Sequence, residues 1–405
     1  MKNNKLKILI LAIVLRVLVA GFLFHPDIKT YNFQASFLKK GVINIYSYLK
    51  ENKSTLPLKD EFVYFPLTYF IVGGYQAVVS GILGSGFDSW LSDAGSNSVV
   101  KNAGIFKYLT VLKLPYLFLD ILVAFLLMKY FKDKKMGEKV AAIWLFNPFT
   151  IVLIYVYSNI DMYAVLLTLA AFLYVKRNKL LQASMFLGIA SCFKLYPMLF
   201  IPFLFLKGKD LKEKISVCLI PIFILGIVVA PFWSPAFVQS ALVSGLTTRI
   251  FSPGFTIGFG ESIIVGLFLL SALFFYGWLF DKEVDLFNYW VMFLLLIFSF
   301  SHFHIVWLLW VAPFIVILAV KKPSLSLPLF LWASLAMAIP LFYQDRSMTI
   351  SLFRVYTTWY DLLPTPFVVL QKFFDPYNFQ SIVHSTLAGG TLVMAYKIFK
   401  KEGGE

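Results

Sequence analysis

Four groups of ionisable side chains lie where apolar stretches of the chain give way to polar ones. They are Asp27 in His25-Pro26-Asp27, Asp161 in Tyr157-Ser-Asn-Ile-Asp161, Lys194, and the pair His302 and His304. A carboxylate can accept a proton from a hydroxyl group, and lysine or histidine can bind an anion such as phosphate. If the fold brings these groups together, they could carry out acid–base chemistry on an anionic substrate.

Each residue also has a structural interpretation that the sequence leaves open. Asp27 could cap a following helix, and so could Asp161. Lys194 could extend its ammonium from a helix end toward water. The spacing of His302 and His304 points them to different sides of a helix, so at most one faces a given ligand, and no third metal ligand lies at a recognisable spacing.

The composition excludes an ordinary soluble enzyme as the carrier of these groups. Of 405 residues, 60% are hydrophobic and only 14% charged, with 44 phenylalanines, whereas soluble domains are roughly 25% charged. The stretch from Leu286 to Phe300 is a long apolar run, unlike the alternating strands of a membrane β-barrel. At roughly 20 residues per crossing, we predict an all-α, polytopic membrane protein with about twelve transmembrane helices.

We interpret the net charge of +15 as a sign of orientation in the membrane, because cytoplasmic loops are rich in Lys and Arg, and not as a sign of nucleic-acid binding. Short Lys-rich segments are expected on the cytoplasmic side together with both termini; they are 129–135, 176–179, 207–214, 321–322 and 397–401. This places residues 25–106 in one long first external loop, followed by external segments at 232–260 and 343–380. Within the first loop, Tyr64–Leu83 is predicted to be an interfacial or re-entrant hairpin, because Pro66 and Gly73-Gly74 interrupt it.

Two further charges lie at similar depth inside apolar helices. Arg16 is in the first predicted helix and Asp120 in the second. A buried charge in a membrane helix needs a partner, so we predict a structural ion pair between them.

The motifs of the first half resemble those of GT-C glycosyltransferases, particularly mannosyltransferases related to the GPI-anchor enzymes. They are Pro26-Asp-Ile-Lys-Thr-Tyr31, Gly41-Val-Ile-Asn-Ile-Tyr46, Tyr64-Phe-Pro66, Trp144-Leu-Phe-Asn-Pro-Phe149, Ser158-Asn-Ile-Asp161 and the segment around Lys194. Later in the chain only the stretch from His302 to Pro313 is similar. These motifs also occur in the family's order and at similar places relative to the predicted helices, which argues against a chance resemblance.

The resemblance implies a GT-C-like bundle, with a family-typical module over residues 1–231 and a variable module over 232–405. It implies an inverting transfer of a sugar, mannose by analogy, from a polyprenyl-phosphate donor to a lipid, glycan or protein acceptor. The reaction would take place on the external face of a prokaryotic plasma membrane, or of the ER membrane in a eukaryote. Asp27 would be the base and Asp161 a second catalytic carboxylate.

The remaining site residues follow from the same interpretation. Cations for the departing phosphate are Lys194, His302, His304 and Arg249, and candidate substrate-binding residues from the first loop are Tyr31, Gln34 and Tyr64. Lys29 stands where many relatives carry a second acidic residue, so a requirement for a divalent cation stays open.

Two other classes remain as alternatives. A transporter would place its binding groups near the bilayer midplane and show paired halves. A membrane acyltransferase would use His302 or His304 as its base and would not need Asp27.

Overall fold

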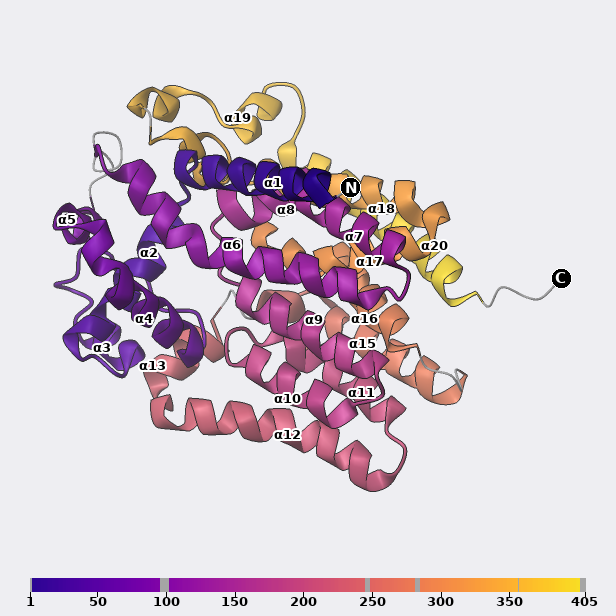
Figure 1. The fold of residues 1–405 in the computed structure, drawn as a ribbon. Helices are drawn as coiled ribbons and strands as arrows, with labels where there is room; N and C mark the ends of the chain where they lie inside the picture. Colours follow the sequence, from indigo (N-terminus) through magenta and orange to yellow (C-terminus); the bar gives the residue numbers. More distant parts are fainter. Residues whose placement is uncertain (1, 95–101, 245–247, 281–284, 356, 401–405) are drawn as a thin grey trace.

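The computed structural model describes residues 2–94, 102–244, 248–280, 285–355 and 357–400. Their regular secondary structure is almost entirely helical (Figure 1). One short antiparallel hairpin joins β1 (Gly254–Gly258) to β2 (Glu261–Ile264). The all-α fold class is confirmed.

Five helical segments of the described chain are long and apolar enough to cross a membrane. They are α4 (Pro66–Leu83), α6 (Ile105–Tyr130), α12 (Leu211–Val229) with the turn η5 (Ala230–Phe232), the turn η9 (Pro323–Leu325) with α18 (Ser326–Leu341), and α20 (Pro376–Phe399). Two bent pairs raise the number to seven if each is one span. The first is α1 (Lys2–Phe22) with α2 (Pro26–Ala35) and the turn η1 (Ser36–Lys40); the second is α7 (Lys134–Phe146) with α8 (Pro148–Ile151) and the π-helix η3 (Val152–Val156). This is the architecture of a multi-pass membrane protein.

The predicted count of about twelve spans is not supported. The other apolar helices of the described chain have only 10–17 residues, fewer than the roughly 20 that one crossing needs. They are α9 (Met162–Lys176), α10 (Leu180–Ser191), η4 (Tyr196–Phe200) with α11 (Ile201–Lys207), α15 (Val265–Leu279), α16 (Leu286–Phe300) and α17 (Ala312–Lys321). Prolines and polar turns divide the apolar runs. The helical stretch over residues 134–156 bends by 51° at Asn147-Pro148, because the residue before a proline disfavours the helical conformation.

The predicted re-entrant hairpin at Tyr64–Leu83 is wrong. The structure has one continuous helix, α4, over Pro66–Leu83. Pro66 occupies the first helical position, where a missing N–H costs nothing. A side chain at Gly73 would come within 2.7 Å of the Ala35 carbonyl oxygen, so this glycine allows α4 and α2 to approach closely and does not break the helix.

The helices between α1 and α6 gather at one end of the bundle, on the left of Figure 1. They include α2, α3 (Ile45–Glu51), α4 and α5 (Gly86–Ser92). The rings of Phe22, at the end of α1, and Phe106, at the start of α6, lie 4.9 Å apart at this end. The 26 residues of α6 span about 39 Å to the opposite end. External placement of all of residues 25–106 requires that α4 does not cross the membrane, although α4 is long and apolar enough to do so, and it stays a prediction.

The segments predicted as irregular external loops contain short helices. In and after 232–260 these are α13 (Pro235–Phe237), the π-helix η6 (Val238–Leu242), η7 (Arg249–Phe251) and the hairpin. In 343–380 they are η10 (Arg346–Met348), η11 (Ile350–Phe353), η12 (Thr358–Leu362), α19 (Pro366–Gln371) and the start of α20.

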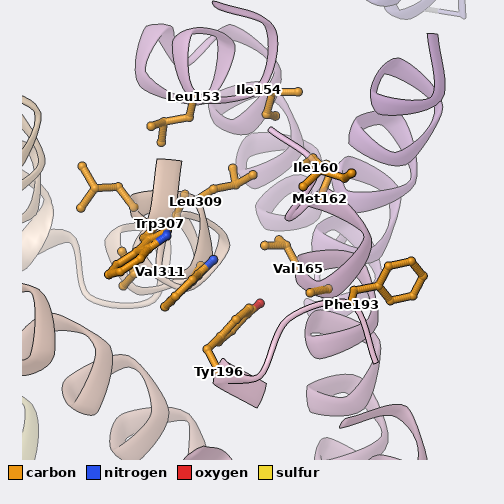
Figure 2. Packing of buried hydrophobic residues seen from close by; sticks show 14 of the residues in the cluster. Leu153, Ile154, Ile160, Met162, Val165, Phe193, Tyr196, Trp307, Leu309 and Val311 are labelled. Carbon is orange, nitrogen blue, oxygen red and sulfur yellow. The ribbon is translucent and has the colours of Figure 1, made fainter. Parts of the chain in front are cut away.

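The core joins both halves of the chain. Figure 2 shows Leu153 and Ile154 of η3, Met162 and Val165 of α9, and Trp307 of η8 (Ile305–Trp310) gathered in one cluster. Because buried residues from before and after position 231 share this core, packing marks no boundary there. The two predicted modules, 1–231 and 232–405, stay a prediction.

Candidate functional site

A polar cavity of about 400 Å³ lies beside the start of α2. It gathers residues that are far apart in the sequence; the lining is Pro26, Asp27, Thr30, Tyr31, Gln34, Asp60, Glu61, Val63, Tyr64, Asp161, Lys194, His304, Val306 and Trp307. Seven of the predicted site residues therefore share one cavity, whereas Arg249 and His302 are outside its lining. We call it the polar cavity below.

Of the two carboxylates predicted to be catalytic, Asp27 is the accessible one. Helix α2 begins at Pro26, and its N-cap is His25, whose Nδ1 accepts a hydrogen bond from the Asp27 backbone N–H at 3.3 Å. The interpretation of Asp27 as the N-cap is therefore wrong. Its side chain is 47% exposed, and its Oδ2 lies 3.6 Å from His25 Nδ1. The carboxylate is thus available to a substrate in the cavity.

Asp161 is buried at the start of α9. Its side chain makes no capping hydrogen bond to that helix. Instead its Oδ2 accepts a hydrogen bond from the indole N–H of Trp310 at 2.7 Å. Burial raises the pKa of Asp161, while the Lys194 charge and the Trp310 hydrogen bond lower it. The carboxylate therefore depends on these two neighbours for its charge.

Lys194 joins the polar cavity to a second, apolar cavity. It lies in the turn between α10 and η4, with Nζ 5.1 Å from the centre of the Tyr64 ring. The second cavity has about 330 Å³ and is lined by Val63, Phe65, Lys194, Leu195, Tyr196, Met198, Leu199, Ile250, Phe251, Trp307 and Trp310. We call it the apolar groove. A cation at the head of an apolar groove suits an amphiphile with an anionic head.

The rings of Tyr196 and Trp310 form one wall of the apolar groove. They stack with centroids 4.3 Å apart, and Trp310 stacks in turn on Trp307 at 5.3 Å. Figure 2 shows Tyr196 facing the group that contains Trp307 and Val311. The indole that binds Asp161 therefore also shapes the groove.

His304 is the histidine that reaches the polar cavity. It caps η8, and its Nδ1 accepts a hydrogen bond from the Val306 N–H at 3.4 Å, which assigns the proton of a neutral ring to Nε2. Burial lowers the pKa of His304 to about 4, against the charge of Asp27, which raises it. At neutral pH His304 is therefore an uncharged hydrogen-bond donor.

His302 and Arg249 lie to one side of the cavity. The His302 ring packs on Tyr343 with centroids 4.8 Å apart. Burial and then the Arg249 charge lower the pKa of His302. Arg249 also adds to the lowering of the His304 pKa, so its positive charge reaches the cavity although its side chain does not line it.

The predicted substrate-binding residues also support the cavity wall. The hydroxyl groups of Tyr31 and Tyr116 lie 2.6 Å apart, and Tyr31 donates to the Ser158 carbonyl at 3.1 Å. Gln34 donates to the Asp60 carbonyl at 2.8 Å. The ring of Tyr64 meets that of Tyr31 edge-on at 6.3 Å. The Tyr31–Ser158 bond therefore fixes α2 against the turn that carries Asp161, and the Gln34–Asp60 bond fixes α2 against the segment before α4.

The sequence interpretation missed Lys113. It is buried in α6 and donates to three carbonyl oxygens, of Ala20 at 2.9 Å, Leu23 at 2.7 Å and Tyr155 at 2.7 Å. One side chain thus ties the end of α1, just before His25, to the π-helix η3. Lys113 could have been found from the sequence, because it is a lysine within the apolar run of α6, two turns before Asp120.

Arg16 and Asp120 form a fully buried pair, with Nε to Oδ2 at 2.5 Å. The second oxygen of Asp120 accepts from the Trp144 indole at 2.5 Å, and Tyr155 donates to Oδ2 at 2.9 Å. The pair therefore connects α1, α6, α7 and η3, and it lies outside both cavities.

Within the described ranges, no three His, Cys, Asp or Glu side chains come together as a set able to hold a metal ion. Comparison of the chain with protein-family models, curated proteins and solved structures finds no match. The class that the fold defines is a helical, multi-pass membrane protein with a polar cavity at one end.

Proposed function

We propose that the protein is a membrane glycosyltransferase of the GT-C type. It transfers a sugar, mannose by analogy, from a polyprenyl phosphate to an acceptor hydroxyl on the external face, with inversion at the anomeric carbon. Asp27 is the general base, and Lys194 and His304 bind the phosphate that departs.

The observation that carries the proposal is the junction at Lys194. The polar cavity and the apolar groove share Val63, Lys194 and Trp307. A polyprenyl phosphate has the matching form, a long apolar chain that ends in an anion attached to a polar sugar. The apolar groove would hold the first isoprene units, and Lys194 would bind the phosphate by a charge-assisted hydrogen bond.

The roles follow from exposure and charge. Asp27 is exposed to the cavity and can accept the acceptor's hydroxyl proton as the oxygen attacks. As the bond to the donor oxygen breaks, negative charge grows on the phosphate, where Lys194 and the Nε2–H of His304 stabilise it. The Lys194 charge lowers the pKa of Asp161, and the Trp310 indole orients the Asp161 carboxylate.

The two alternatives have less support. A transporter needs binding groups near the midplane, whereas this cavity lies beside the junction of α1 and α2, at the end of the bundle where α6 begins. An acyltransferase needs an unprotonated histidine nitrogen toward the substrate. The described hydrogen bond of His304 already uses Nδ1, which leaves the protonated Nε2 for the cavity.

Replacing Lys194 by alanine is expected to weaken donor binding about tenfold or more, because a hydrogen bond to a charged group contributes about 1.5–3 kcal/mol. His304→Ala should act in the same direction and more weakly, since the neutral ring is only a hydrogen-bond donor. Binding of a polyprenyl-phosphate sugar to the purified protein in lipid measures the effect, with acceptor KM as the comparison.

Lys107→Ala is the control, because Lys107 is an exposed lysine in the first turn of α6 and lines neither cavity. Unchanged donor affinity in both Lys194→Ala and His304→Ala would remove them from the donor site. Arg249 would then be the next cation to test.

The external placement of residues 25–106 predicts the reactivity of a thiol at Ser89. Ser89 is exposed in α5. After replacement of Cys192 and Cys218 by serine, Ser89→Cys in right-side-out membranes should react with an impermeant maleimide, and Lys212→Cys should react only after permeabilisation. The reverse pattern would contradict the external placement of residues 25–106.

A further inference from the structure

The short hairpin of β1 and β2 is exposed on both of its faces. In the two strands, every residue except Gly258 and Ile264 is exposed. At the turn between them, the Phe259 side chain is fully exposed. A two-stranded hairpin is only marginally stable by itself in water. This hairpin, which the described part of the chain leaves uncovered, would therefore gain stability from a partner that covers it.

The two faces of the hairpin differ in polarity. Residues paired across an antiparallel ladder lie on the same face. Phe255 pairs with Ile263, and Ile257, two residues after Phe255, points to the same side. These three side chains are 68%, 44% and 67% exposed, respectively. Thr256 pairs with Ser262 on the other face. The hairpin is therefore amphipathic, and we call the surface of Phe255, Ile257 and Ile263 its apolar face.

The turn of the hairpin carries a bulky apolar residue in a strained conformation. Phe259 has φ = 49°, in the left-handed region. Glycine or asparagine is usual there, and an aromatic residue is an outlier. Because the ring is fully exposed, packing within the described chain does not offset this cost. Insertion of the ring into an apolar environment outside the chain would do so.

The chain passes from the hairpin directly into α15, which has an exposed apolar surface. Ile264 of β2 is the N-cap of α15. The large apolar side chains that this helix exposes include Leu267, Phe268, Phe275, Trp278 and Leu279. Between Arg249 and Asp281, the only charged residue in the sequence is Glu261. In a multi-pass membrane protein, an exposed surface that is this apolar and uncharged faces lipid.

Helix α15 is too short to cover the thickness of a membrane by itself. Its 15 residues span about 22 Å, whereas the hydrocarbon core of a bilayer is about 30 Å thick. The strands that precede it extend by about 3.3 Å per residue. The apolar face of the hairpin therefore lengthens the lipid-facing surface of α15 at its N-terminal end.

The polar groups of the hairpin limit how deep it can lie. A two-stranded sheet has backbone N–H and C=O groups on its outer edges, and these groups need partners that hydrocarbon does not supply. The hydroxyl groups of Thr256 and Ser262 and the carboxylate of Glu261, beside the turn, also need water. The headgroup region supplies water on one side and acyl chains on the other.

We propose that the β1–β2 hairpin lies in the headgroup region of the bilayer, with its apolar face and the Phe259 ring turned toward the acyl chains. The partner is lipid and not a second copy of the chain. The apolar face offers only three residues, whereas a standard protein interface has roughly 20–30 residues a side. This inference does not depend on the proposed transferase activity.

The base of the hairpin adjoins the apolar groove. The Val265 N–H donates to the Pro253 carbonyl at 3.0 Å and closes the hairpin. A side chain at Gly266 would come within 2.9 Å of the Ile250 carbonyl oxygen, so α15 begins in close contact with η7. Ile250 and Phe251 of η7 line the groove. A hairpin in the headgroup region therefore places this side of the groove at the membrane boundary, where an amphiphile can enter from the bilayer.

The test measures the depth of single labels in phosphatidylcholine vesicles. In a chain with Cys192 and Cys218 replaced by serine, Ile257→Cys and Thr256→Cys each receive an environment-sensitive fluorophore. A lipid nitroxide near the headgroup should quench the label at position 257. Iodide in the water should quench that label at least about twofold less than the label at position 256, because an interfacial element buries its apolar face by about 5–10 Å.

Thr256→Cys is the matched control, because Thr256 is the preceding exposed residue of the same strand and lies on the opposite face. Equal iodide quenching of both labels, without quenching by the lipid nitroxide, would place the hairpin in water and overturn the proposal. A label at position 257 that neither quencher reaches would show that protein covers the apolar face, and a second copy of the chain would replace lipid as the partner. Strongest quenching of both labels by a nitroxide at the end of the acyl chain would contradict the headgroup position.

Discussion

Asp27→Asn is expected to abolish sugar transfer while the protein stays folded and still binds its donor. Asparagine has nearly the size of aspartate but cannot take up a hydroxyl proton at neutral pH. Loss of general-base assistance alone lowers the rate by about a hundredfold or more. Because His25 and not Asp27 caps α2, the substitution should leave the helix start intact and change the unfolding temperature little.

The measurement needs purified protein in lipid, a polyprenyl-phosphate sugar, and parallel determinations of kcat, donor affinity and thermal unfolding. Asp60→Asn is the matched control, since Asp60 is an exposed carboxylate of the same polar cavity to which no role in catalysis is assigned. If Asp27→Asn turns over like the parent while Asp161→Asn does not, the base is Asp161. If both variants retain full turnover, the glycosyltransferase proposal fails and the transporter alternative becomes the leading one.

The sequence predicts the fold class because composition decides it, but it does not predict the number of spans. An apolar run has the same hydropathy whether it is one straight helix or two short bent ones. At Asn147-Pro148 and between Phe22 and Pro26 the chain bends by 51° and 83°. In α4 the prediction failed in the other direction, because a helix was expected to be interrupted and is continuous. Pro66 starts this helix, and Gly73 lets it pack closely against α2.

The sequence also identifies many of the residues that line the polar cavity. Ionisable side chains next to membrane-like apolar stretches cost free energy, so they are candidates for functional residues. Asp27, Asp161, Lys194 and His304 are brought together as their types suggest. It does not distinguish His302 from His304, since their orientation depends on the irregular turn before η8. The apolar groove was not predicted, because its wall depends on stacking between Tyr196 and Trp310, residues 114 positions apart in the sequence.

Asp120→Ala is expected to destabilise the protein by about 3–5 kcal/mol, the usual cost of leaving one member of a buried ion pair unpaired. Arg16 is fully buried, and its other described side-chain hydrogen bond goes to the Ala12 carbonyl at 3.1 Å. Without Asp120, the Trp144 indole and the Tyr155 hydroxyl also lose their acceptor. The loss should appear as a large fall in the midpoint of denaturant unfolding in mixed micelles.

The double variant Arg16→Met with Asp120→Leu separates an unpaired charge from a lost contact. If the cost comes mainly from the unpaired guanidinium, removal of both charges should recover most of the stability, because apolar side chains of similar volume can replace a buried ion pair with little loss. The coupling free energy in this double-mutant cycle should then exceed about 1 kcal/mol. Additive losses would show that the two charges do not interact, and the ion pair would not be what holds α1 against α6. Since Lys113 also links the end of α1 to η3, donor binding and turnover of the double variant should stay close to those of the parent, which distinguishes this structural pair from the residues of the polar cavity.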